Sequence, residues 1–272
     1  MEKVNGVKIA EGIIQKLKSR DKPDKIFAAI QVGNDPVSEN FLKQKEKVAK
    51  ELGVDFRIYK FTEEIKNDEL RKEVGKIALL KPVGGVIIQL PLPKHLNRHY
   101  ILNVIPREKD LDVLGERALG AFYTDRNPIL PPAVGVVDAI LTTYDLRPTT
   151  LKVAVIGLGF LVGKPVATWL MRKCSNLYLL HKGSDLKILK QVDLVISGVG
   201  QAGIIKPEML KENAGVIDFG YSLDESGKIS GDFDAQLPIT NYQLLNFYTP
   251  TPNGTGPILV AKIFENFYKL NL

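Results

Sequence analysis

The sequence predicts an α/β protein with two domains, each built on a parallel sheet. Its 272 residues exceed the size of one ordinary domain. Short apolar segments alternate with helical patterns along the chain, as they do in βαβ units. Two such series occur, one on each side of a joint within residues 115–150. We place the domains at 1–116 with 256–272 and at 117–255.

Composition excludes several classes of protein. Hydrophobic residues are 44% and charged residues 25% of the chain, as in ordinary globular proteins. No apolar run reaches the roughly 18 residues of a membrane span, and Met1–Gly6 does not resemble a signal peptide. Cys174 is the only cysteine, and His95, His99 and His181 lack zinc-site spacing. We expect a reduced, cytoplasmic protein with no membrane partner and no metal.

The net charge of +6 indicates an anionic partner. Lysine and arginine are mixed with acidic residues, and the sequence has no basic arm of the kind that binds nucleic acid. An anionic small substrate or cofactor is therefore favoured, and no nucleic-acid partner is expected.

Three strands and their helices make up the first series. Asp35 and Pro36 are a typical N-cap and first helical residue. The nearly continuous apolar run at 84–89 is typical of a strand covered on both faces. The predicted strands are 26–33, 56–61 and 84–89, the helices 35–52, 63–80 and 98–103, and 106–115 is a loop.

The second series follows a helix predicted at 132–144. Its strands are short and apolar, and the last helix follows a loop rich in proline and glycine. The predicted strands are 152–156, 177–180, 194–197 and 216–219, and the last helix is 257–268.

Lys45 is a candidate proton carrier. On the helix 35–52 it falls in the apolar stripe with Ser38, Phe41, Val48, Ala49 and Leu52, whereas Lys43, Lys47 and Lys50 lie opposite. Desolvation lowers a lysine pKa toward neutrality, where the amine can exchange protons. The alternative is a lysine whose stem packs at the core edge while its amine reaches water.

Gln89 and two aspartates are candidate ligand-binding groups. Gln89 ends an apolar strand, at the edge where open α/β sheets bind ligands, and alternatively satisfies loop backbone groups. The Leu90–Pro91 bond is a candidate cis peptide. Asp110 and Asp112 either cap turn amides or bind a heterocycle with adjacent N–H donors.

The segment 153–163 ends a strand in a glycine-rich turn that can cradle a phosphate, which makes the C-terminal domain Rossmann-like. Its Gly-x-Gly-x-x-x-Gly spacing is one residue longer than the common pattern, and a purely structural turn is the alternative. The next strand ends in His181-Lys182-Gly183, without the acid that binds a ribose 2′-hydroxyl. Lys182 can face a 2′-phosphate, which favours NADP over NAD.

Several segments share their order and spacing with one family. The chain resembles the bifunctional methylenetetrahydrofolate dehydrogenase/methenyltetrahydrofolate cyclohydrolase family over essentially its whole length. The matching segments are Val32–Lys47, Gly85–His95, Lys109–Asp112, Val162–Pro165, Gly198–Gly200, Gly231–Asp234 and Thr249–Pro257.

The resemblance implies an NADP-dependent oxidation of 5,10-methylenetetrahydrofolate, then hydrolysis of the methenyl product to 10-formyltetrahydrofolate, in a cleft between the domains of a homodimer. It implies three catalytic residues, Lys45, Gln89 and Asp112. The implied substrate-binding residues are Phe41, Ile88, Leu90, Pro91, Pro252 and Asn253. The implied cofactor-binding residues are Gly157, Leu158, Gly159, Gly163, Lys164, Pro165, His181, Lys182, Gly200 and Tyr221.

The chain departs from the family pattern at several of these positions. Phe41 replaces the usual tyrosine, and Val113 replaces the glycine after Asp112. Leu158 and Lys182 replace an arginine and a serine of the cofactor site, Leu259 replaces a threonine, and Pro131–Ala133 replaces a Cys-Thr-Pro segment. Three alternatives stay open: a cyclohydrolase with a weakened or lost dehydrogenase activity, a non-catalytic folate-binding paralogue, and another NAD(P)-linked dehydrogenase on a similar plan.

Overall fold

The computed structural model describes residues 2–171, 173–223, 227–235 and 245–272. Contacts within the chain divide it into two units. The six-stranded unit comprises residues 1–10 and 133–259, and the three-stranded unit comprises residues 11–132 and 260–272. Two of the three divisions fall within helices α1 (Gly6–Lys18) and α8 (Thr255–Asn271), so each of these helices contributes to both units. The third falls after Pro132, the first residue of α6. No helix in the described ranges is long and apolar enough to cross a membrane.

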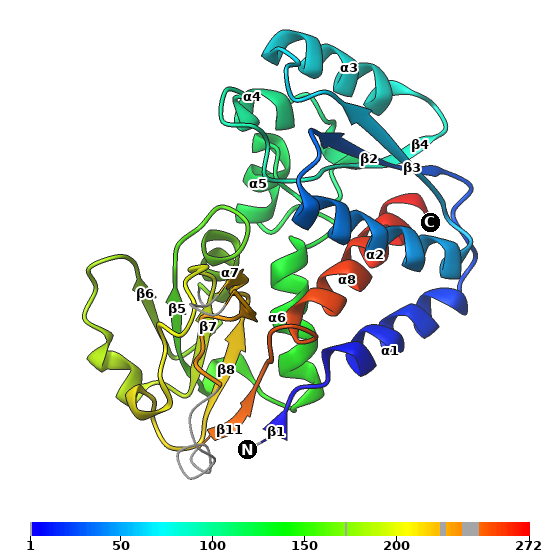
Figure 1. Ribbon diagram of the computed structural model, residues 1–272. Coiled ribbons are helices and arrows are strands. Elements are labelled where there is room, and N and C mark those ends of the chain that lie inside the picture. The colour runs from blue at the N-terminus through cyan, green and yellow to red at the C-terminus, as the bar shows by residue number, and fades with distance from the viewer. Residues whose placement is uncertain (1, 172, 224–226, 236–244) are drawn as a thin grey trace. The chain divides into compact units, whose positions relative to one another are not determined.

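The three-stranded unit is a parallel sheet in the order β3-β2-β4. Central β2 is buried along its whole length, as its apolar sequence predicts. Helix α2 and the end of α8 cover one face of this sheet, and α3 covers the other (Figure 1). The elements are β2 (Ile26–Val32), α2 (Pro36–Leu52), β3 (Asp55–Phe61), α3 (Asn67–Leu79), β4 (Val83–Ile88), α4 (Arg98–Leu102), the 3-10 turn η1 (Arg107–Lys109) and α5 (Glu116–Tyr123).

Aromatic rings form the centre of this unit. The ring of Phe27 on β2 lies 5.0 Å from Phe56, 5.1 Å from Phe264 and 5.3 Å from Phe267, measured between centroids. Such pairs bury large apolar areas and add about 0.5–1.5 kcal/mol each beyond that burial. The end of α8 is therefore part of the core of this sheet.

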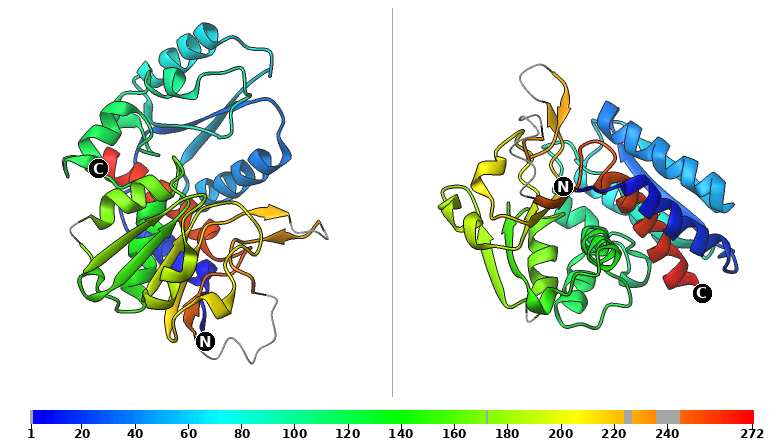
Figure 2. Two further views of the ribbon diagram at one scale, coloured as in Figure 1. Left: turned by 90° about the vertical axis from the view of Figure 1, so that its left-hand side faces the viewer. Right: turned by 90° about the horizontal axis from the view of Figure 1, so that it is seen from below.

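The six-stranded unit is a parallel sheet in the order β1-β11-β8-β7-β5-β6. The antiparallel pair β9 and β10 stands apart from it (Figure 2). The elements are β1 (Glu2–Lys3), α6 (Pro132–Thr143), η2 (Pro148–Thr150), β5 (Lys152–Ile156), α7 (Gly163–Leu170), β6 (Asn176–Leu180), η3 (Leu186–Gln191), β7 (Leu194–Ser197), η4 (Pro207–Met209), β8 (Ala214–Asp218), β9 (Ser222–Leu223), β10 (Ile229–Ser230) and β11 (Leu245–Tyr248).

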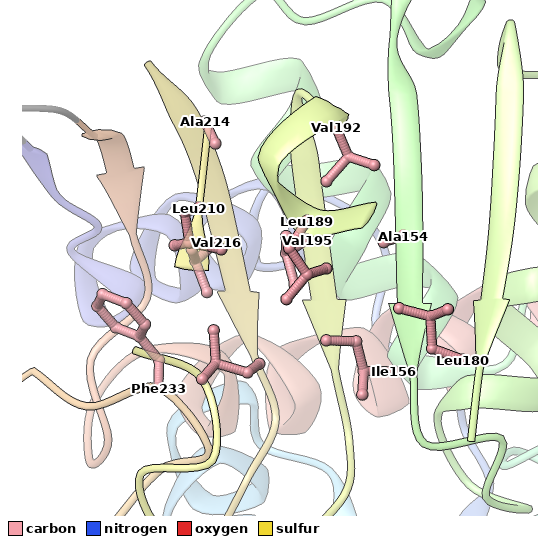
Figure 3. Close-up of a cluster of buried hydrophobic side chains, with 11 residues drawn as sticks. Ala154, Ile156, Leu180, Leu189, Val192, Val195, Leu210, Ala214, Val216 and Phe233 are labelled. Carbon is pink, nitrogen blue, oxygen red and sulfur yellow. The ribbon is translucent and has the colours of Figure 1, made fainter. Parts of the chain in front are cut away.

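One face of this larger sheet carries a compact apolar cluster (Figure 3). Ala154, Ile156, Val195 and Val216 point from the strands toward Leu189 of η3 and Leu210, which follows η4. Short 3-10 segments of six and three residues therefore cover this face between β6 and β8. The β5–α7–β6 connection contains the full helix that a Rossmann-like unit places there.

The predicted fold class and all seven predicted strands are confirmed, with small shifts at their ends. One boundary is wrong by a full turn: the helix predicted from residue 63 begins at Asn67, because 62–65 form a separate turn in which the Ile65 amide donates to the Thr62 carbonyl. The sequence reasoning missed β1, α1, α5 and β9 to β11.

Candidate active site

Lys45 lies midway along α2 on its buried face, with Ser38, Leu42, Ala49 and Leu52. Asp35 caps this helix by accepting the Ser38 amide at 2.7 Å, as predicted. Lys45 is 7% exposed, and its amine donates to Gln89 Oε1 at 2.8 Å. The other three lysines of the helix are exposed. The helical stripe predicted around Lys45 is therefore confirmed, and the amine does not reach bulk water.

Gln89 is the first residue after β4 and serves two partners. Its Oε1 accepts from Lys45, and its Nε2 donates to the Leu90 carbonyl at 3.0 Å. The alternative that Gln89 satisfies the loop backbone is therefore confirmed, and the same side chain also holds the Lys45 amine. Its role in ligand binding stays a prediction. The Leu90–Pro91 peptide is cis, as predicted, and a second cis bond at Thr251–Pro252 was not anticipated.

The structure separates the roles of the two aspartates. Asp110 is 2% exposed, and its Oδ2 accepts the Leu114 amide at 2.9 Å and the Gly115 amide at 2.7 Å. It is a loop cap, and burial raises its pKa to about 6. Asp112 interacts instead with Lys45: burial raises the pKa of Asp112 to about 7, against the opposing charge of the lysine.

Burial also lowers the pKa of Lys45, and the charge of Asp112 partly opposes that shift. The lowered pKa of Lys45 favours the neutral amine, which can accept a proton as a general base does.

Asn266 on α8 supports the Asp112 loop, and the sequence reasoning missed it. It is 3% exposed, and its Nδ2 donates to the carbonyls of Leu111 at 2.9 Å and Leu130 at 2.8 Å. Val113, next to Asp112, is buried with a φ of 57°, a conformation that costs a β-branched residue energy. The available signal was an asparagine that precedes Phe267 and Tyr268 in the mostly apolar helix α8.

The predicted substrate residues of the three-stranded unit lie around these groups. The Lys45 amine is 6.0 Å from the centroid of the Phe41 ring, one helical turn away. Ile88 is buried, Leu90 is half-buried and Pro91 is exposed. Pro91 also lines a cavity of about 1160 Å³ at the carboxyl ends of the three strands. Lys45, Gln89 and Asp112 are absent from the lining of that cavity.

The glycine-rich turn between β5 and α7 fits a dinucleotide cradle. Gly157 has a φ of 82°, which favours glycine, and a Cβ there would lie 2.9 Å from the Gly198 carbonyl. A methyl group on Gly163 would overlap the Gly157 carbonyl. The Lys164 amide donates to the Gly159 carbonyl at 3.0 Å. These close approaches are the ones that a phosphate-binding turn needs.

The other predicted cofactor residues lie at the carboxyl edge of the same sheet. His181 and Lys182 follow β6 and are exposed, and no acidic residue lies between β6 and Ser184. The Ser184 hydroxyl accepts the His181 amide at 3.0 Å. Gly200 has a φ of 74° after β7, and Tyr221 follows β8. Leu158 is half-buried in the turn, and Pro165 is buried in the first turn of α7.

The structure therefore brings Lys45, Gln89, Asp112 and Phe41 together within the three-stranded unit. Pro252 and Asn253 belong to the six-stranded unit, where both are exposed. Asn253 has a φ of 74°.

Comparisons with known proteins agree with this division. Residues 4–112 match the catalytic domain of tetrahydrofolate dehydrogenase/cyclohydrolase, and residues 131–271 match its NAD(P)-binding domain. The chain is 33% identical over 282 residues to the bifunctional protein FolD of Mycoplasmopsis synoviae, with 99% of each chain covered.

Solved structures give the same result. The Campylobacter jejuni FolD methylenetetrahydrofolate dehydrogenase/cyclohydrolase has a TM-score of 0.92 at 29% identity, over 98% of this chain and 97% of that one. The Trypanosoma brucei enzyme, complexed with NADP cofactor and inhibitor, has a TM-score of 0.91 at 25% identity, over 99% and 96%. The chain belongs to the tetrahydrofolate dehydrogenase/cyclohydrolase family.

Proposed function

We propose that this chain oxidises 5,10-methylenetetrahydrofolate with NADP and hydrolyses the 5,10-methenyl product to 10-formyltetrahydrofolate. The observation that carries the proposal is the buried Lys45 amine, held 2.8 Å from Gln89 Oε1 and beside the Asp112 carboxyl group, in the part of the chain that matches the catalytic domain.

Lys45 is the proton carrier of the hydrolysis. Water adds to the methenyl carbon, and a proton must leave that water as the carbon–oxygen bond forms. A neutral amine accepts it and returns it to the ring nitrogen as the carbon–nitrogen bond breaks. The hydroxyl on the former methenyl carbon gives its proton to solvent as it becomes the carbonyl of the formyl group on the other nitrogen, so the hydrolysis of the cation releases one proton. Burial lowers the pKa of Lys45 and so favours the neutral amine, and the hydrogen bond to Gln89 Oε1 fixes the position of the nitrogen.

Asp112 binds the pterin ring. Adjacent N–H donors on that ring match the two oxygens of a carboxylate, and such charge-assisted bonds are worth about 1.5–3 kcal/mol each. Phe41, Ile88, Leu90 and Pro91 supply the surrounding apolar contacts. Pro252 and Asn253 are further substrate-binding residues of this proposal.

The six-stranded unit binds the cofactor. NADP, when bound, supplies the hydride acceptor of the oxidation. Amides of the turn from Gly157 to Gly163 and the start of α7 hold its pyrophosphate. Lys182 offers one point charge to the 2′-phosphate, and Leu158 offers none, so the preference over NAD is modest.

The remaining assignments follow the same proposal. Residues 1–116 with 256–272 form the folate-binding catalytic domain, and residues 117–255 form the cofactor-binding domain. The enzyme acts as a homodimer in the cytoplasm.

The test is the absorbance of the methenyl product. With methylenetetrahydrofolate, we expect a transient rise that requires NADP and is weaker with NAD. With methenyltetrahydrofolate and no cofactor, we expect decay faster than in buffer. Hydrolysis without oxidation would identify a cyclohydrolase that has lost its dehydrogenase activity. The absence of both reactions would contradict the proposal.

A further inference from the structure

A second buried carboxylate system lies in the six-stranded unit, away from the residues assigned above. Asp232 is fully buried and accepts three short hydrogen bonds. Its Oδ2 accepts the Ser197 hydroxyl at 2.6 Å and the Val199 amide at 2.7 Å, and its Oδ1 accepts the Gln201 amide at 2.8 Å. Two of the three donors therefore belong to the turn 198–201 that follows β7.

That turn contains Gly200, whose φ of 74° lies in the left-handed region. The amides on both sides of Gly200 are tied to opposite oxygens of one carboxylate. Fixing two alternate amides of a four-residue turn sets the direction of the peptide groups between them. The conformation of the turn thus depends on a side chain more than thirty positions later in the sequence.

Asp232 is itself held in place from the neighbouring strand. Asp218, at the end of β8, accepts the Gly220 amide at 2.6 Å and the Phe233 amide at 2.8 Å on its two oxygens. Phe233 anchors its other side in the apolar cluster of the sheet (Figure 3). A methyl group on Gly220 would overlap Asp232 Oδ1, so the segments pack at the closest possible distance.

We propose that Asp232 is a positioning residue for the cofactor: it holds the turn 198–201 in the conformation that receives the dinucleotide. The inference rests on the proposed function, because it assumes that the carboxyl edge of this sheet binds NADP. It adds a residue that itself touches no cofactor atom, since its oxygens are occupied by protein donors.

The sharpest test is Asp232→Asn. Whichever terminal atom becomes the amide nitrogen, it faces a backbone N–H that it cannot accept: the Val199 amide on one side or the Gln201 amide on the other. On the Val199 side the Ser197 hydroxyl can turn to accept from the new amide, but that restores no bond to the turn. The turn therefore loses one of its two ties in either orientation. We expect the Kd for NADP, measured by calorimetry, to rise at least about tenfold.

Two variants serve as matched controls. Ser197→Ala removes only the hydroxyl donor on the strand side and leaves both turn amides paired, so the Kd should change less than about threefold. Asp193→Asn changes another carboxylate that accepts a backbone amide, that of Lys152 at 2.8 Å, at the opposite end of β7. It should leave the Kd unchanged.

Kinetics separate positioning from general destabilisation. For Asp232→Asn, the KM for NADP should rise while kcat at saturating NADP and the cofactor-free hydrolysis stay near the wild-type values. A folded Asp232→Asn protein that binds NADP like wild type would overturn the inference. The inference would also be overturned if both activities fell in proportion to the fraction of folded protein. If this variant does not fold, Asp232→Ser tests the same amides with a smaller side chain. Wild-type protein that binds no NADP would instead contradict the proposed cofactor.

Discussion

Lys45 combines a buried amine with a fixed partner, so its role can be tested without changing its volume. Lys45→Met keeps the shape and removes the nitrogen, and no charge remains to be desolvated. The hydrolysis rate should fall about 10²–10⁴-fold, the usual contribution of a general acid–base group, with an unchanged or higher Tm. Lys47→Met, an exposed lysine on the same helix, is the control. A variant that keeps more than about a tenth of the rate would remove Lys45 from the mechanism.

Asp112 titrates near the pH at which the enzyme is expected to work. Asp112→Ala should weaken folate binding at least about tenfold in a fluorescence titration and leave NADP binding intact. Because burial raises the pKa of Asp112 to about 7, the ionised form that pairs with the pterin grows as the pH rises through that value. Wild-type folate affinity should therefore increase from about pH 6 to about pH 8. The variant should lose this dependence, and unchanged affinity in the variant would make Asp112 a structural loop residue.

Lys182 is the single cation at the end of β6 that replaces the usual serine. A lysine attracts a 2′-phosphate without the paired geometry of arginine, so we expect an NADP preference of about tenfold, or about 1.4 kcal/mol. Lys182→Ala should abolish it. The measurement is the ratio of kcat/KM with the two cofactors in both proteins. A wild-type preference for NAD, or one that Lys182→Ala leaves intact, would refute the assignment.

At the scale of elements, the β5–α7 turn depends on the absence of side chains. Gly163→Ala places a methyl group against the Gly157 carbonyl and about as close as 2.9 Å to Leu158 Cα. The turn must open, and NADP binding should weaken at least about tenfold while hydrolysis persists. Gly12→Ala is the control: it lies in the exposed face of α1 with no atom near its Cβ, and should stabilise the protein by about 0.5–1 kcal/mol. Equal effects of the two changes on NADP affinity would contradict this account.

Elements that are buried on both faces could be predicted from the sequence, and others could not. Strands β2, β4 and β7 consist almost wholly of apolar residues, and that pattern needs no knowledge of neighbours. Strand β1 is two exposed charged residues whose pairing with β11 depends on residues from the other end of the chain. Such a strand leaves no periodic signal, so only the tertiary structure reveals it.

Some residues of the candidate site could likewise be predicted from the sequence, and others could not. Lys45 could be found because helical spacing places one lysine among apolar residues, and Gln89 because it interrupts an apolar strand. Asp110 and Asp112 could not be told apart, because two residues of separation do not show which carboxyl group turns toward backbone amides. Asn266 and Asp232 act through contacts with distant segments, which a local pattern cannot encode.

At the scale of the whole molecule, Asp218 couples stability to pH. Burial raises its pKa to about 7, against about 3.9 in an unfolded chain. Its contribution to stability is therefore complete below about pH 4 and is lost as the pH rises through about 7. The free energy of unfolding, measured with urea from about pH 5 to about pH 8, should fall with pH in the wild type. In Asp218→Asn this fall should be shallower, by up to about 1.4 kcal/mol per pH unit.

The control for this measurement is Asp193, whose pKa is shifted in the opposite direction to that of Asp218. Hydrogen bonds and the charge of Lys211 hold the pKa of Asp193 below its ordinary value despite the opposing effect of burial. The contribution of Asp193 to stability is present above its pKa in the unfolded chain and is lost only as the pH falls. Asp193→Asn should therefore leave the decline of the unfolding free energy near neutral pH as steep as in wild type. If the free energy of unfolding changed with pH in the same way in wild type and Asp218→Asn, the Asp218 carboxyl group would not control the pH dependence of stability.

The chain passes between the two units three times, within α1, at the start of α6 and again within α8. During synthesis, Phe27 leaves the ribosome long before Phe264 and Phe267, the rings that cover it. Strand β1 likewise waits for β11, its neighbour in the finished sheet. Each unit therefore completes its core only after the segment that it receives from the distant part of the chain has been made. A nascent chain that ends before residue 264 therefore carries Phe27 without two of its neighbouring rings, an exposed apolar surface that is prone to aggregation.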